Sequence, residues 1–112
     1  FPGPKVEFVG DYEKIEYPNR EEFLGRVRNI GKKRADFVKV TFFLWDSTTD
    51  PLGVGEAMVD GATTKFTTGV ISDASLKPGQ MGTYRVLVEK QKGTKISYRT
   101  NEVTWRDYKA KE

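Results

Sequence analysis

Apolar side chains recur at every second position through the middle of this chain. They are Val38, Val40, Phe42 and Leu44. Successive side chains of a β-strand point to opposite faces of its sheet, so a period of two indicates a strand that buries one face. Burying each of these side chains contributes about 1.5–3 kcal/mol relative to exposure. The segment therefore predicts a core strand, which ends at Asp46 before a polar loop that runs to Gly53.

Other β-prone segments follow along the chain, with turn signals between them. They cover residues 5–17, 22–30, 54–59, 63–71, 83–90 and 95–105. In the turn at residues 76–79, Pro78 fixes its own φ and Gly79 accepts a positive φ. We find no sustained helical period in any segment. The sequence therefore predicts an all-β, antiparallel sandwich of about seven strands, with an open barrel as the alternative.

Two of these segments carry irregularities. Residues 5–17 are interrupted at Gly10-Asp11, which predicts one kinked edge strand or two short strands. The apolar residues of the last segment change from even to odd positions, at Ile96, Tyr98, Val103 and Trp105. We expect a bulge or bend near Thr100-Asn101 that restores the register.

The length of 112 residues predicts one domain over residues 1–112. We expect residues 1–4 to form a leader and residues 107–112 a frayed, charged tail. No apolar run approaches the ~20 residues of a membrane span. Because the chain begins at Phe1, not Met, we expect a processed protein or an excised domain from which a signal or anchor was removed. The 19 basic and 16 acidic residues give a mixed surface, so we expect no nucleic acid partner.

Catalytic chemistry has few candidates. The chain has no His and no Cys, which removes the commonest general base and the thiol nucleophile. Carboxylate pairs remain, at Asp46 with Asp50 or Glu21 with Glu22. Loop aspartates more often cap the backbone, and the 46–50 loop lacks the glycine and terminal glutamate of an EF-hand calcium site. We therefore expect no enzyme, no metal and no cofactor.

Several segments together resemble the FxLYD domain family. The matching residues are Phe42-x-Leu44-Trp45-Asp46, Gly25-x-Val27-x-Asn29-x-Gly31, Gly53, Leu76-x-Pro78-Gly79-Gln80 and Tyr84. Trp45 stands where the family's name has Tyr, and the resemblance covers residues 23–90. It implies an immunoglobulin-like sandwich from bacterial or archaeal envelope and secreted proteins. The family has no established catalytic activity, so the resemblance carries no functional residues to this chain.

The most specific candidate site is an apolar patch. If the even positions of residues 38–44 point inward, Phe43 and Trp45 point outward, and the same alternation in residues 83–90 sends Leu87 outward. In an immunoglobulin-like topology these two strands, the third and the penultimate, would be neighbours in one sheet. Phe43, Trp45 and Leu87 would then form a surface for a partner protein or a second copy. In the alternatives, the 1–17 segment or the tail with Tyr108 covers the patch, or Trp45 turns inward.

A basic cluster is the second candidate. It consists of Arg26, Arg28, Lys32, Lys33 and Arg34, with the two strand arginines on one face and the others in the adjoining turn. Such a cluster suits a polyanion, although a solvated turn that discourages edge pairing explains it equally well. We thus expect a non-enzymatic interaction or spacer module of an exported or cell-envelope protein. The alternative is a carbohydrate- or polyanion-binding module that uses the aromatics or the arginines.

Overall fold

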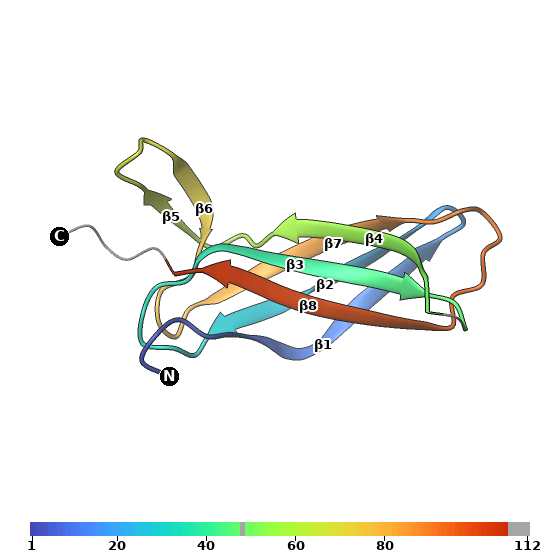
Figure 1. Cartoon of the computed structure of the whole chain (residues 1–112), viewed down its shortest axis with the longest axis horizontal. Coiled ribbons are helices and arrows are strands. Elements are labelled where there is room, and N and C mark those ends of the chain that lie inside the picture. Colours follow the sequence, from blue (N-terminus) through green and yellow to red (C-terminus); the bar gives the residue numbers. More distant parts are fainter. Residues whose placement is uncertain (48, 108–112) are drawn as a thin grey trace.

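The computed structural model describes residues 1–47 and 49–107, and these residues form an all-β, antiparallel structure (Figure 1). Eight strands follow in chain order: β1 (Val6–Tyr17), β2 (Arg20–Asn29), β3 (Asp36–Trp45), β4 (Pro51–Met58), β5 (Ala62–Lys65), β6 (Ile71–Ser75), β7 (Met81–Glu89) and β8 (Tyr98–Arg106). The described chain contains no helix that is long and apolar enough to cross a membrane.

Two three-stranded sheets pack face to face, in the orders β1-β2-β7 and β4-β3-β8. The third unit is the β5–β6 hairpin, which stands off one end of the sandwich in Figure 1. The alternation predicted for β3 is confirmed, because Val38, Val40, Phe42 and Leu44 are all fully buried. In β2, Phe23 and Val27 likewise lie in the core, whereas Arg26 and Arg28 are exposed.

An aromatic cluster fills the space between the sheets. Phe23 of β2 stacks on Phe42 of β3, with ring centroids 4.1 Å apart and an angle of 11° between the ring planes. Tyr12 packs edge-on against both rings, at 5.4 and 5.1 Å. Tyr12 reaches them from an irregularity in β1 between Val9 and Glu13, where Gly10 takes a φ of 64°. The 5–17 segment is therefore one edge strand with a kink, as one of the two sequence alternatives had it.

The sandwich is closed on one side by a close approach between β4 and β7. A Cβ atom added at Gly55 would collide with the carbonyl oxygen of Leu87, and one at Gly53 would lie 2.6 Å from the carbonyl oxygen of Glu89. Only glycine lets the two backbones approach this closely. The opposite side, between β1 and β8, has fewer contacts between its strands.

Buried polar side chains tie the loops to the sheets. The amide of Asn29 accepts hydrogen bonds from the backbone N–H groups of Lys5 and Gly31, at 3.2 and 2.9 Å. It donates to the carbonyl oxygens of Lys33 and Leu76, at 2.7 and 2.9 Å. Gly31 lies so close to the leader that a Cβ there would collide with Gly3. One side chain thus joins Lys5, just after the leader, to the turns at residues 30–33 and 76–80.

The structure refines one expectation about strands and overturns another. The β-prone segment 63–71 supplies parts of two strands, because its ends belong to β5 and β6 and a turn at Phe66–Val70 separates them, and the described residues form eight strands where about seven were expected. The bulge expected near Thr100-Asn101 is absent, since β8 pairs with β3 in unbroken register from Tyr98 to Thr104. Ile96 lies before β8 and Tyr98 points outward, so the change from even to odd apolar positions requires no bulge within β8. The irregularity lies instead in β3, at Phe37, whose φ is 48°.

Candidate interaction surface

The outer face of the β4-β3-β8 sheet carries a cluster of four apolar side chains. Trp45 lies between Phe43 and Tyr98, with ring centroids 6.1 and 5.8 Å away. Val54 of β4 lies opposite Phe43 in the sheet register, and Tyr98 of β8 lies opposite Trp45. Val54 is 53% exposed and Tyr98 is 47% exposed. We call Phe43, Trp45, Val54 and Tyr98 the aromatic face.

Two interactions hold the indole of Trp45 in place. Its Nε1–H donates a hydrogen bond of 2.8 Å to Thr100 Oγ1, on the neighbouring strand β8. The indole and the Tyr98 ring are nearly parallel, at 6°, and the indole is inclined by 30° to the Phe43 ring. Trp45 is therefore the last residue of β3 and belongs to the outer face, so the alternative in which it turns inward is wrong.

Leu87 does not join this cluster. Strand β7 belongs to the β1-β2-β7 sheet and β3 to the other sheet, so the prediction that the two strands are neighbours in one sheet is wrong. Leu87 lies on the outer face of its own sheet and is 48% exposed. The chain between β3 and β7 holds β4 and the β5–β6 hairpin, and β4 takes the place beside β3 that the sequence assigned to β7. Tyr108, the residue proposed as a cover, lies outside the described residues.

The basic cluster is divided by the structure. Arg26 and Arg28 are exposed on the outer face of β2, and Lys32 and Lys33 are exposed in the turn that follows. Arg34 is occupied elsewhere: its guanidinium binds the buried carboxylate of Asp36 through Nε at 2.7 Å and Nη2 at 3.2 Å. It also lies 5.6 Å from the centre of the Phe66 ring. Arg34 therefore stabilises the junction with the β5–β6 hairpin.

Acidic residues accompany the arginines of the β1-β2-β7 sheet. Glu7 of β1 lies directly opposite Arg28 in the sheet register, and Glu89 of β7 lies opposite Arg20. Arg85 forms an ion pair of 2.6 Å with Glu22. Because cross-strand charges of opposite sign offset each other, these three arginines offer a polyanion little unbalanced positive charge, whereas Arg26 lies opposite the uncharged Val9 and Thr83.

The paired carboxylates considered from the sequence are separated by strand alternation. Glu21 points into the sandwich and is fully buried, whereas Glu22 points outward to Arg85. Glu21 accepts hydrogen bonds from Arg99 Nε at 2.5 Å, Arg99 Nη2 at 2.7 Å and Lys90 Nζ at 3.1 Å. Burial alone would raise the pKa of the Glu21 carboxyl, but the hydrogen bonds from Arg99 and Lys90 outweigh it, so this pKa is lowered. The hydrogen bond to Glu21 in turn raises the pKa of Arg99.

The 46–50 loop follows the aromatic face, and its residue 48 lies outside the described residues. Within residues 1–47 and 49–107, no group of three or more acidic side chains is placed to hold a metal ion.

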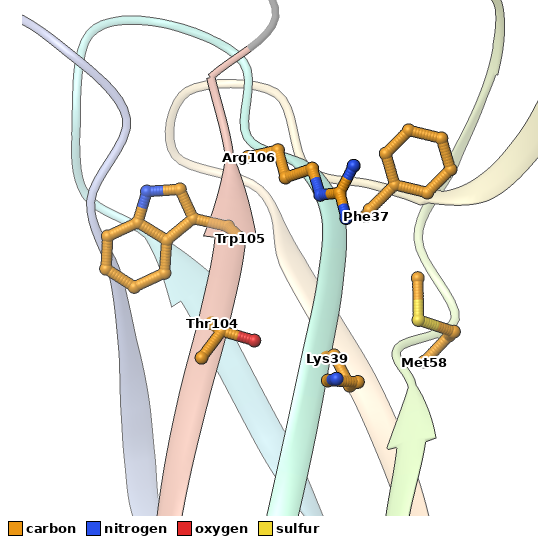
Figure 2. Close-up of a pocket in the computed structure, with 6 residues that line it drawn as sticks. All are labelled: Phe37, Lys39, Met58, Thr104, Trp105 and Arg106. Carbon is orange, nitrogen blue, oxygen red and sulfur yellow. The ribbon is translucent and has the colours of Figure 1, made fainter.

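One shallow cleft of about 400 Å³ lies at the other end of the β4-β3-β8 sheet. It is lined by Phe37, Lys39, Met58, Thr104, Trp105 and Arg106. Figure 2 shows the indole of Trp105 pointing away from Phe37 and Met58. Of its two cations, Lys39 is held in an ion pair of 3.2 Å with Glu56, and the guanidinium of Arg106 lies 6.0 Å from the centre of the Phe37 ring. The cleft therefore brings together no set of polar groups that converge on a ligand.

Two members of the aromatic face, Val54 and Tyr98, were missed by the sequence argument. Tyr98 was grouped with Ile96 by its even position, although alternation counted back from Val103 and Trp105 places it on the outer face. Val54 had no such signal, because its place opposite Phe43 depends on the register between β3 and β4. Comparisons of the chain with models of known protein families, with curated proteins and with solved structures find no match.

Proposed function

We propose that this chain is a non-enzymatic, immunoglobulin-like interaction module of an exported or cell-envelope protein, and that it contacts a protein partner through the aromatic face. The observation that carries the proposal is the exposed apolar surface of Val54 and Tyr98 beside the half-buried rings of Phe43 and Trp45. Contiguous apolar surface with aromatic anchors is typical of protein contact sites.

The strand order supports the immunoglobulin-like part of this proposal. The first two strands share a sheet with β7, and β3 shares the other sheet with β8. This arrangement corresponds to strands A, B and E in one sheet and C and F in the other, without a G strand among the described residues. The residues that resemble the FxLYD family also have structural roles. Asn29 joins three segments, and the ring of Tyr84 lies so close to Gly25 that a Cβ there would collide with it.

The geometry favours a protein over the glycan or polyanion alternatives. A sugar ring stacks on an open aromatic face, but the indole of Trp45 has a neighbouring ring at 5.8 Å and another at 6.1 Å. Three arginines of the opposite sheet, Arg20, Arg28 and Arg85, have acidic neighbours. A protein contact needs neither an open indole face nor an unbalanced charge, because burial of apolar area drives it.

Site-specific photocrosslinking in the source cell tests the proposal. A photoreactive amino acid replaces Val54 in one variant and Ile71 of the β5–β6 hairpin in the other, which is 62% exposed and serves as the control. We expect one discrete crosslinked protein species from position 54 and none from position 71. Equal crosslinking at both positions, or none at position 54, would contradict the proposal. Salt-sensitive retention on immobilised heparin, or retention on insoluble polysaccharide, would support the alternatives.

A further inference from the structure

Strand β8 has an open edge. Among the described residues, β8 pairs only with β3, and no strand lies on its other side. The other three edges of the two sandwich sheets are protected. Strands β4 and β7 lie against each other, and β1 is interrupted by the bulge at Gly10. Natural sheets protect their edges with bulges, proline, charged side chains, inward-pointing charges or covering segments. Residues 98–106 contain no proline, no glycine and no lysine, and their inward-pointing charge, Arg99, lies outside residues 102–106.

The core is also incomplete beside this edge. Phe8, Ile96, Val103 and Trp105 pack against the buried core but are themselves only partly buried. They belong to β1, to β8 or to the segment just before β8, so they lie along the less tightly closed side of the sandwich. An additional strand beside residues 102–106 would cover Val103 and Trp105 and offer hydrogen-bond partners to the backbone groups on that side of β8.

We propose that the β8 edge binds the β8 edge of a second copy of this chain in an antiparallel, twofold-symmetric pair. The two β4-β3-β8 sheets would then form one continuous six-stranded sheet. This surface is separate from the aromatic face: an edge contact is made by backbone groups at the side of the sheet, so the two proposals can fail independently.

The outward-facing side chains of β8 are complementary in charge across such a pair. Glu102 and Arg106 are both exposed and are four residues apart on the same face. In an antiparallel register centred on Thr104, each Glu102 lies opposite Arg106 of the other copy, which gives two cross-strand pairs of opposite charge. On the inner face, Val103 of each copy lies opposite Trp105 of the other. Because a twofold axis brings the same surface of both copies together, the contact is isologous and the assembly closes at two copies.

A cysteine substitution tests the register directly. The chain has no cysteine, so Thr104→Cys introduces the only thiol. Directly opposed residues of antiparallel strands have Cα atoms about 4.5–5.5 Å apart, within the range that a disulfide spans. Under mild oxidation, we expect Thr104→Cys to form a disulfide-linked dimer rapidly. Thr67→Cys, at an exposed position in the hairpin turn, should form one only at the rate of random collision.

Charge-reversal variants give the second test. Analytical ultracentrifugation at chain concentrations up to the millimolar range measures the dissociation constant of the dimer for each variant. We expect Glu102→Arg and Arg106→Glu each to weaken the dimer at least about tenfold, because two opposite-charge pairs become like-charge pairs. The double variant should recover the dimer, and a mixture of the two single variants should form a heterodimer. A wild-type chain that stays monomeric throughout the range overturns the proposal. So does a dimer that none of these variants alters, since its contact lies elsewhere, for example on the aromatic face.

Discussion

Removing the buried carboxylate of Glu21 should destabilise this protein strongly. Glu21 is fully buried and binds Arg99, whose side chain is 16% exposed, and Lys90, whose side chain is 10% exposed. In Glu21→Ala both cations lose this partner, and breaking a buried ion pair in this way costs about 3–5 kcal/mol. A chain of this length typically has a free energy of unfolding of about 6–17 kcal/mol, so the variant should lose a large part of its stability.

The neighbouring residue provides the control. Glu22 binds Arg85, whose side chain is 66% exposed, so Glu22→Ala leaves a cation that water can solvate. We expect a loss of at most about 1 kcal/mol for this variant. Urea denaturation followed by tryptophan fluorescence measures both changes. If Glu21→Ala costs no more than Glu22→Ala, the buried network does not stabilise the fold and the reasoning is refuted.

The same network predicts how stability depends on pH. The pKa of Glu21 in the folded chain is below its ordinary value of 4.5, so the folded state favours the carboxylate. The resulting stabilisation is fully present above the pKa of the unfolded chain and is lost as the pH falls through the lower, folded-state pKa. The difference in free energy of unfolding between the wild-type chain and Glu21→Gln should therefore shrink as the pH falls below 4.5. A difference that stays constant down to acid unfolding would contradict the assignment.

Two further predictions concern the close approach of β4 to β7 and the buried tyrosine. Gly55→Ala should lower the free energy of unfolding by about 1–3 kcal/mol in urea denaturation, because its Cβ would collide with Leu87. Gly3→Ala, where the nearest atom is 3.9 Å away, should change it by less than about 0.5 kcal/mol, and equal effects would contradict the packing described. Burial, together with the nearby Tyr12, raises the pKa of Tyr84 to about 12, so the phenolate absorbance of this tyrosine should appear only near that pH. The neutral phenol of Tyr84 contributes stability that is complete below the pKa of the unfolded chain and is lost as the pH rises through 12. Loss of the absorbance step near that pH in the Tyr84→Phe variant confirms the assignment.

Local sequence patterns predicted the elements well but not their partners. The period of two in β3 placed its four core side chains correctly, and Pro78-Gly79 predicted a turn in which Gly79 does have a φ of 81°. Such signals depend on neighbouring residues alone. The sheet that contains β7 depends on long-range packing, in which β4 and the β5–β6 hairpin intervene between β3 and β7. Leu87 was therefore assigned to the wrong sheet although its outward direction was correct.

Long-range contacts also decided the roles of the charged residues. Glu21 lies in the sequence beside another glutamate, which suggested a carboxylate pair, yet its partners Lys90 and Arg99 are 69 and 78 residues away. Arg34 belonged to the densest basic cluster of the sequence, and its partner Asp36 is only two residues away, but the long-range hydrogen bond from Ser75 shows that this carboxylate is part of the buried junction with β6. Only the folded arrangement shows which charges are paired and which remain at the surface.

Comparison of two adjacent phenylalanines tests most directly the claim that one face of β3 forms the core while the other remains available for contact. Phe42 is fully buried, and Phe43 is half-buried on the aromatic face. In urea denaturation, we predict that Phe42→Ala lowers the free energy of unfolding by about 3–5 kcal/mol, whereas Phe43→Ala lowers it by about 1 kcal/mol. Equal losses, or a larger loss for Phe43→Ala, would mean that the outer face serves the fold and would contradict the account.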